Sequence, residues 1–363
     1  MRATAFAPWS RAGAPTPPAT AAKGHQHYRN LLNATEQAAY DLLRGSLARF
    51  DAAVALPQRL DARSLQLVFQ GLKLDEPELF YVSELTLVES MPGPRRTLAV
   101  PTYVMSRAEA EAELERLRAA AEPIARAAAG LDDFGKLAAL HDGLAARFTY
   151  DDADALCAHE ATGALVYGRG VCDSAAKALK YLCDRCGIPA VVAIGQANSA
   201  ACFPGAAGSP AATTSHAWNL VRVRDGAADC WYHLDVTHDA LMGTDCPRYD
   251  YFCLSDADIS SDHSLSADAY YPRCPRSFGY YPRAGRFAAS RSELERILRQ
   301  ARATGESPLV FQLPRMQGAD ARFTQQILQM ASDVLAPSSP APTTVHLKSN
   351  PSQMVFQVTV EPA

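Results

Sequence analysis

Three residues far apart in the sequence could act together as a cysteine nucleophile and its acid–base partners. Cys172 follows residues 168–171, where two glycines permit a tight turn, and a helical pattern of apolar residues begins directly after it. Unpaired backbone N–H groups and the helix dipole favour a thiolate there, so the pattern predicts a reactive cysteine. His216 opens one predicted strand, and Asp235 lies near the end of the next.

The chemistry of this set is that of a Cys-His-Asp triad. The imidazole of His216 would accept the thiol proton, and Asp235 would orient the ring and stabilise its charged form. The sulfur of Cys172 would then attack a carbonyl carbon and form an acyl thioester. Alone, each residue has an ordinary structural explanation, as a buried helix cysteine, a strand histidine or a strand-end aspartate. Their joint occurrence favours the catalytic interpretation.

The motifs around these residues resemble, in order, the core of the transglutaminase-like superfamily, the bacterial branch of the papain-like cysteine enzymes. The resemblance covers about residues 133–290, through His159 and the segments 163–165, 168–172, 187–189, 216–219, 231–237 and 251–256. It implies an α+β fold with a papain-like core, in which the helix that carries the nucleophile packs on an antiparallel sheet.

The resemblance also implies the reaction. Cys172 would attack the carboxamide of a glutamine side chain, His216 would protonate the departing ammonia, and an amine or water would resolve the thioester. Three functions stay open: a transglutaminase-like enzyme acting on protein or peptide amides, a cysteine peptidase with the same triad, and an inactive module that binds peptide or cell-wall material. Candidate oxyanion donors are the Cys172 N–H and Tyr167. Trp218 and Asn219 are further candidate contacts; Trp218 has packing around the site as the alternative, and Asn219 has a local hydrogen bond or support of His216.

Two positions depart from the family pattern. Residues 174–176 are Ser-Ala-Ala where relatives commonly have Gly-Tyr-Ala, which leaves the wall of the cleft and the substrate preference open. His238 stands where relatives commonly have tryptophan, and we expect it to face solvent, with a role in the pH dependence of the site as the alternative. We expect His141 to be a packed or solvent-edge histidine and not a catalytic one.

Composition limits the possible functions. The chain has 363 residues, 48% of them hydrophobic, which is enough for a full core and predicts either two units or one core with appendages. A net charge of −4 with no long basic run argues against nucleic acid as a partner. No apolar run approaches the length of a membrane span. The first 27 residues are rich in Ala, Pro and Gly and predict a disordered tail, not a signal peptide, so we expect a cytoplasmic protein, or an exported one if the start codon is misassigned.

No metal or cofactor is expected from the sequence. The nine cysteines are odd in number and irregularly spaced, so we expect mostly reduced thiols. Cys183 and Cys186 lie within one predicted helix and have no second pair to complete a zinc site. The acidic stretches, Asp151, Asp152 and Asp154 and then Asp256, Asp258 and Asp262, lack the pattern of a calcium loop and predict solvated turns. The expected partner is a protein or peptide substrate, and the oligomeric state stays open.

The predicted organisation has four parts: a tail (1–27), a helical and small-sheet region (28–130), the transglutaminase-like core (131–290) and a small α+β unit (291–363). In the core, the elements that must position the triad are a helix from Cys172, a strand at 190–195, a loop at 196–214, and a hairpin of 217–223 with 230–236. Other predicted strands are 79–82, 84–88, 96–104, 308–313 and 354–360. Other predicted helices include 106–129, 292–303 and 323–335. Residues 337–342 are predicted to be a linker.

Overall fold

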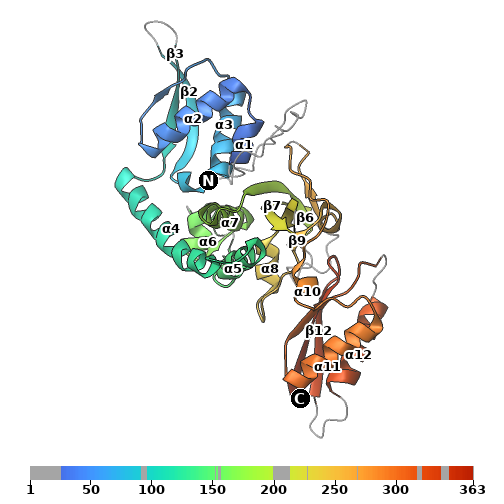
Figure 1. Cartoon of the computed structure of the whole chain (residues 1–363). Helices are drawn as coiled ribbons and strands as arrows, with labels where there is room; N and C mark the ends of the chain where they lie inside the picture. Colours follow the sequence, from blue (N-terminus) through green and yellow to red (C-terminus); the bar gives the residue numbers. More distant parts are fainter. Residues whose placement is uncertain are drawn as a thin grey trace.

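A computed structural model describes residues 26–90, 96–151, 153, 157–198, 213–226, 228–267, 269–316, 321–336 and 343–362. The predicted tail lies outside these residues except for Gln26 and His27, and His27 begins the first helix. The chain mixes helices with mainly antiparallel sheets, so the predicted α+β class is confirmed. In Figure 1 the N-terminal elements, the central elements and the C-terminal elements follow one another along the molecule.

The N-terminal elements are helices around a small sheet of order β1-β3-β2. Side-chain caps define where the helices begin, because Asn33, Asp61 and Ser106 each accept a hydrogen bond from a first-turn backbone N–H. The elements are α1 (His27–Leu31), α2 (Ala34–Ala48), β1 (Val54–Ala55), α3 (Ala62–Asp75), the 3₁₀ helix η2 (Pro77–Leu79), β2 (Val82–Ser90), β3 (Arg96–Tyr103) and α4 (Arg107–Ala128).

The central elements surround a five-stranded antiparallel sheet of order β10-β6-β7-β8-β9. They are α5 (Asp133–Ala145), β4 (Thr149–Tyr150), α6 (Ala161–Val166), β5 (Arg169–Gly170), α7 (Cys172–Cys186), β6 (Ala190–Asn198), β7 (Thr213–Asp225), β8 (Ala228–Leu234), α8 (Val236–Met242), β9 (Phe252–Leu254), α9 (Asp256–Ile259), β10 (His263–Leu265) and α10 (Tyr280–Arg283).

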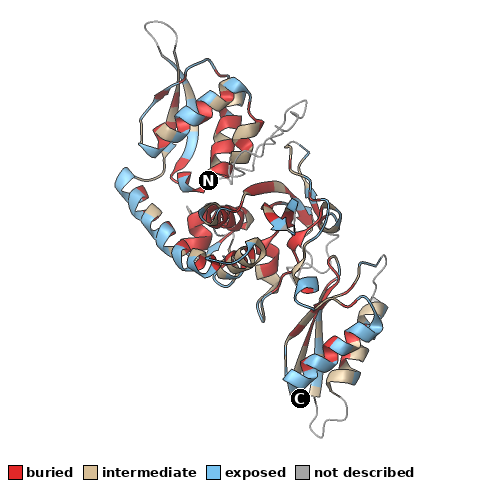
Figure 2. Cartoon of the chain, viewed as in Figure 1, coloured by how far each residue is buried: buried red, intermediate tan, exposed pale blue. Residues whose placement is uncertain are grey.

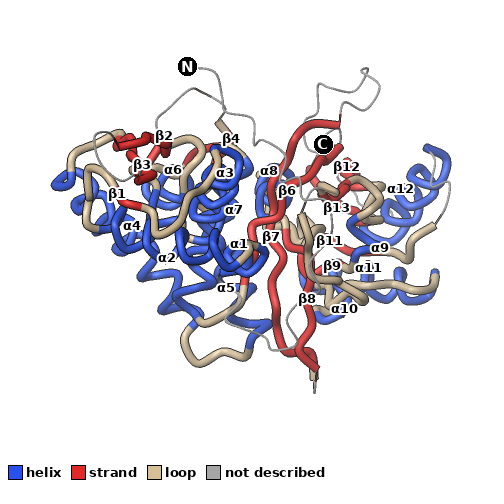
Figure 3. The backbone as a smooth tube through the Cα atoms, turned by 90° about the horizontal axis from the view of Figure 1, so that it is seen from above, coloured by secondary structure: helices blue, strands red, loops and turns tan. Residues whose placement is uncertain are grey.

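Helix α7 lies in the middle of the fold. Its residues from Asp173 to Cys183 are all buried, and it contacts β6 and β7 on one side and α4, α5 and α6 on the other. Figures 2 and 3 show this buried helix beside the strands of the large sheet. Gly187 ends the helix in the left-handed conformation (φ 73°), which glycine adopts without steric cost. The nucleophile candidate therefore begins a helix that is held by packing along most of its length.

The C-terminal elements form a separate hydrophobic core, with α11 and α12 on a sheet of order β11-β13-β12. The elements are α11 (Arg291–Thr304), β11 (Leu309–Gln312), α12 (Ala321–Leu335), β12 (Thr343–Asn350) and β13 (Val355–Pro362). This unit is joined to the central elements by buried polar contacts, in which Arg248 donates to Gln357 (3.1 Å) and Asn350 to Asp250 (3.0 Å). Strand β12 was not predicted, and the predicted linker 337–342 lies outside the described residues.

One hydrophobic cluster runs through both the N-terminal and the central elements, from Tyr28 to Tyr281, and also includes Val355 of β13. The buried hydroxyl of Tyr28 donates to the carbonyl of Val192 in β6 (2.5 Å), which ties α1 to the large sheet. The N-terminal region therefore packs directly on the core. The predicted domain boundaries stay predictions.

Several predicted elements differ from the observed ones. Residues 77–79 form a 3₁₀ turn, and the following strand begins only at Val82. The predicted hairpin exists, but Asp225 pairs with Ala228, so its connection is shorter than expected. Strand β8 ends at Leu234 and a helix follows, where the strand was predicted to continue to 236. Of the predicted loop 196–214, residues 199–212 lie outside the described residues and the rest belong to β6 and β7.

Gly195 of β6 pairs with Leu265 of β10, and it gives a test of the sheet. A Cβ atom there would overlap the carbonyl oxygen of Ser264 and lie 2.8 Å from the Trp218 ring. We expect Gly195→Ala to lower the free energy of unfolding by about 1–3 kcal/mol, because β10 must move away. Urea unfolding followed by circular dichroism measures the change.

Gly45→Ala in α2 is the matched control. The nearest atom to its Cβ, Nη1 of Arg49, is 3.4 Å away, so we expect a gain of roughly 0.5–1 kcal/mol in the free energy of unfolding. Equal stability changes in the two variants would contradict the close approach of β10 to β6.

Candidate active site

Cys172 is the first residue of α7, and the turn before it depends on glycine. Strand β5 pairs in parallel with β4, and the Val171 N–H donates to the carbonyl of Ala158 (3.0 Å). Gly170 has φ 158°, and a Cβ there would lie 2.8 Å from that same carbonyl oxygen. A larger residue at 170 would displace the turn. The glycine before Cys172 therefore helps to set the position of the Cys172 sulfur.

The Cys172 thiol is held beside β7. The backbone N–H of Ala217 is close enough to the sulfur to lower the pKa of the thiol, and the carboxylate of Asp235 is close enough to raise it. Burial, followed by the negative charge of Asp173, raises the pKa of the thiol to about 12, although the Ala217 N–H lowers it. The Asp173 N–H at the helix N-terminus also lowers this pKa, as expected, but desolvation outweighs it, so the thiol form is favoured in this state.

His216 and Asp235 are in direct contact. His216 lies in β7 opposite Gly195 of β6, and its Nε2 donates to Oδ2 of Asp235 at 2.7 Å. Asp235 is the N-cap of α8, where its Oδ1 accepts the backbone N–H groups of Thr237 (2.9 Å) and His238 (3.2 Å). The cap fixes the carboxylate, and the carboxylate fixes the ring of His216.

The three predicted residues thus converge in one region of the molecule. Ala217, whose N–H contacts the Cys172 sulfur, is the residue directly after His216. Because His216 uses Nε2 for Asp235, Nδ1 is the ring nitrogen left to exchange a proton with a thiol. This arrangement can carry out acid–base chemistry at a cysteine.

The other three candidates occupy different environments. Trp218 is buried, stacks on His216 with ring centroids 5.9 Å apart, and donates from Nε1 to Nδ1 of His233 (3.0 Å). Asn219 is also buried, and its amide donates to the carbonyl of Ala176 in α7 (2.9 Å). Neither side chain is therefore exposed for contact with a bound substrate. Tyr167, in contrast, is 46% exposed at the end of α6.

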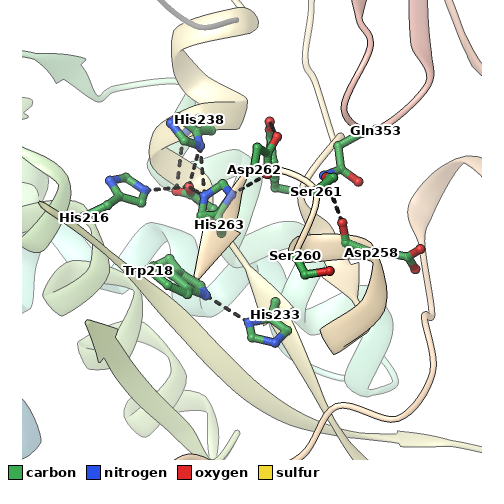
Figure 4. Close-up of polar contacts among 12 residues, drawn as sticks. His216, Trp218, His233, His238, Asp258, Ser260, Ser261, Asp262, His263 and Gln353 are labelled. Atoms are coloured by element: carbon green, nitrogen blue, oxygen red, sulfur yellow. Dashed lines mark hydrogen bonds and ion pairs between the residues drawn. The ribbon is translucent and has the colours of Figure 1, made fainter. Parts of the chain in front are cut away.

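Two further histidines lie at this site and were not assigned to it from the sequence. His238 is 1% exposed, so the expectation that it faces solvent is wrong. Its Nδ1 lies 2.9 Å from Oδ2 of Asp235. His263 of β10 brings its Nε2 to 3.1 Å from the same oxygen. In Figure 4 the rings of His216, His238 and His263 surround one carboxylate.

The sequence signal for His263 is slight: an aspartate followed by a histidine at the end of an acidic turn. Asp262 accepts from Nδ1 of His263 (2.6 Å) and from the hydroxyl of Tyr251 (2.6 Å). Its side chain is 2% exposed, so the prediction of a solvated turn is wrong for this residue.

Burial and charge oppose each other throughout this cluster. Burial by itself would raise the pKa of Asp235, but the charges and hydrogen bonds of His216 and His238 outweigh it and hold that pKa well below its ordinary value. Burial lowers the pKa of His216, and Asp235 only partly offsets the effect. For His263, hydrogen bonds to Asp235 and Asp262 outweigh burial and raise the pKa to about 9.

Helix α8, which presents Asp235, is anchored to α5 by a buried histidine. His141 is 1% exposed, and its Nε2 lies 3.1 Å from Oδ2 of Asp239 in α8. The other carboxylate oxygen of Asp239 accepts the Tyr251 N–H (3.1 Å). His141 is therefore a packed histidine, as predicted, with a role in holding α8.

Residues 118–236 match the sequence model of the transglutaminase-like superfamily. A solved structure titled "Crystal structure of a TGase" is similar to this chain with a TM-score of 0.29 and 14% identity; the match covers 51% of this chain and 50% of that one. The chain therefore spans about half the length of that structure. No curated protein matches the sequence.

The superfamily match shows that residues 118–236, about a third of the chain, form a transglutaminase-like segment. The matched segment begins within α4, contains Cys172, His216 and Asp235, and ends at the start of α8. This match favours an enzymatic role in general, on a cysteine-enzyme fold. Among the described residues, none of the helices combines the length and apolar character that crossing a lipid bilayer needs.

Asn219 gives a test of how the strand with His216 is held to the helix with Cys172. We expect Asn219→Ala to lower the free energy of unfolding by about 1–3 kcal/mol, because a buried hydrogen bond between β7 and α7 is lost. As a control, Gln329→Ala removes an exposed amide bonded to Asp333 and should change stability by less than about 0.5 kcal/mol. Urea unfolding compares the two, and an unchanged Asn219→Ala protein would show that this bond stabilises nothing.

Proposed function

We propose that this protein is a transglutaminase-like cysteine enzyme that forms an acyl thioester at Cys172 from a protein or peptide amide. The observation that supports the proposal best is the buried bond between His216 Nε2 and Asp235 Oδ2 (2.7 Å), next to the Ala217 N–H that contacts the Cys172 sulfur. A nucleophile, a base and a group that orients the base are thereby brought together on α7, β7 and α8.

In the proposed mechanism the resting site is uncharged at sulfur and imidazole. As Cys172 attacks the amide carbonyl, His216 takes the thiol proton on Nδ1 while Nε2–H stays bonded to Asp235. The new C–S bond forms as the C=O electrons move to oxygen. His216 then gives the proton to the departing nitrogen, and ammonia leaves from a glutamine side chain. An amine or water attacks the thioester and frees the sulfur.

The oxyanion formed in this step needs donors near the sulfur. The N–H of Cys172 is among the first in α7, and the first N–H groups of a helix have no partner within it. It is therefore suited to donate to the oxyanion. Tyr167 remains the proposed second donor, although its hydroxyl interacts with Glu113 and Arg116 of α4.

Cys172→Ala should abolish incorporation of a fluorescent primary amine into a glutamine-containing peptide library, because no thioester can form. Cys186→Ala is the matched control: this cysteine ends the same helix, is likewise half-buried, and should be dispensable. Mass spectrometry of the library measures amine incorporation, deamidation and chain cleavage together.

Each outcome of that experiment has a separate meaning. Amine incorporation or deamidation of intact peptides that needs Cys172 supports the proposal. Cleaved peptides that need Cys172 would replace it with a cysteine peptidase using the same residues. A protein that modifies no peptide, or one in which Cys172→Ala keeps full turnover, would contradict the proposal.

Asp235→Asn should reduce kcat by roughly 10²–10⁴-fold while the fold persists. Asparagine is also a good N-cap, so α8 keeps its first turn, but the amide cannot stabilise an imidazolium as a carboxylate does. Steady-state kinetics with circular dichroism as the check on folding measures this. A folded variant with the wild-type kcat would show that Asp235 only caps the helix.

A further inference from the structure

Asp235 is contacted by more histidine nitrogens than one oxygen can serve by hydrogen bonding. His216 Nε2, His238 Nδ1 and His263 Nε2 lie 2.7, 2.9 and 3.1 Å from Oδ2. His216, Asp235, His238 and His263 have exposed fractions of 6%, 1%, 1% and 3%. Their four possible ligand atoms all lie within 4.8 Å of one another. Only the bond from His216 belongs to the proposed triad.

The hydrogen atoms cannot satisfy all of these contacts. His238 Nδ1 and His263 Nε2 are themselves 3.1 Å apart. If both carry hydrogen toward Asp235, the two hydrogens oppose each other. If either of these nitrogens instead accepts a hydrogen bond from the other, the lone pair of the accepting nitrogen lies toward His263 or His238 and not toward a hydrogen on the carboxylate, so its contact with Oδ2 is repulsive. One contact is repulsive in either arrangement, whereas a cation among the four atoms would make every one of them a ligand.

The surrounding groups hold these atoms in the orientation that a metal needs. Nδ1 of His263 is bonded to Asp262, which is the arrangement of a carboxylate behind a metal-binding histidine. Oδ1 of Asp235 is occupied by the N–H groups of Thr237 and His238, so Oδ2 is the oxygen directed at the histidines. Three imidazoles and one carboxylate are a ligand set for tetrahedral Zn²⁺, whose ligands lie about 2.0–2.2 Å from the ion.

A second group, His233 with Asp256 and Cys274, also has metal-ligand composition but is satisfied by protein contacts. Trp218 donates to Nδ1 of His233, so Nε2 carries the hydrogen and donates to Asp256 (3.0 Å). No lone pair of that ring remains for an ion. Closeness of the possible ligand atoms alone therefore does not indicate a metal site. The cluster at Asp235 differs because its hydrogen-bond donors compete for one oxygen.

We propose that His216, Asp235, His238 and His263 form a binding site for a divalent transition-metal ion of the Zn²⁺ type, and that the bound ion inhibits the enzyme. The inhibition rests on the proposed function, whereas the binding does not. With the ion on Nε2, neutral His216 carries its hydrogen on Nδ1, which then cannot accept the thiol proton of Cys172. Four protein ligands also leave no open position for a metal-bound water.

The binding test uses the full chain stripped of metal with a chelator. Titration calorimetry should give one tight Zn²⁺ per chain, and Co²⁺ should give the intense visible bands of a tetrahedral ion without sulfur-to-cobalt charge transfer. Asp262→Asn keeps all four ligands and should weaken Zn²⁺ binding by about 10–100-fold. His263→Ala should weaken it further. His346→Ala, which removes an exposed histidine of β12, should bind as the wild type does.

The outcomes separate the site from its effect. The site would be overturned if the chain bound no Zn²⁺ tightly, or if bound Co²⁺ showed charge transfer from sulfur. It would also be overturned if Asp262→Asn and His263→Ala bound Zn²⁺ as tightly as the wild type. If Zn²⁺ binds as described but the Cys172-dependent reaction runs at the same rate with one equivalent bound, the inhibition is overturned and the site stands. If no Cys172-dependent reaction exists, the proposed function fails, and the inhibition with it, while the calorimetry still decides the site.

Discussion

The carboxylate of Asp235 is the constraint on which the rest of the site depends. One oxygen caps α8, and the other receives His216 from β7. Because the chain changes from strand to helix at this residue, a single side chain fixes both the start of α8 and the orientation of the imidazole. The contact of His141 with Asp239 then holds α8 against α5, so the position of the carboxylate is set from two directions.

Burying a carboxylate in this position is costly unless its charge is compensated. Here the compensation comes from imidazoles, which are groups that bind either a proton or a metal ion. The same cluster therefore suits two states: one in which His216 is free to act as a base, and one in which a cation occupies its Nε2. The proposed chemistry and the proposed inhibition are two uses of one arrangement.

The triad candidates could be predicted because each is marked locally. Glycines precede Cys172, and His216 and Asp235 each lie in a short motif with aromatic neighbours. His263 could not be found in this way, because its place depends on the pairing of β10 with β6 across a long stretch of chain. The burial of His238 was missed for a related reason: residues 235–242 leave the sheet and form α8, whereas β-branched residues around Asp235 favour a strand.

The ionisation of the Cys172 thiol was harder to predict than its position in the fold. The helix N-terminus at Cys172 was correctly located, but its effect on the thiol is smaller than that of burial, and burial depends on how α7 packs against the sheet. Strand β12 was missed because its residues alternate between half-buried and exposed with polar side chains such as Lys348, which weakens the apolar signal.

The most direct measurement of the central claim is the mass of the Cys172 peptide after the protein is mixed with a glutamine-containing substrate and quenched in acid. If the sulfur, the imidazole and the carboxylate act as one unit, the wild-type peptide carries the substrate's acyl group as a thioester, and His216→Ala and Asp235→Asn accumulate it far more slowly. A Cys172 peptide that stays unmodified, or one acylated equally fast in all three proteins, would contradict the account.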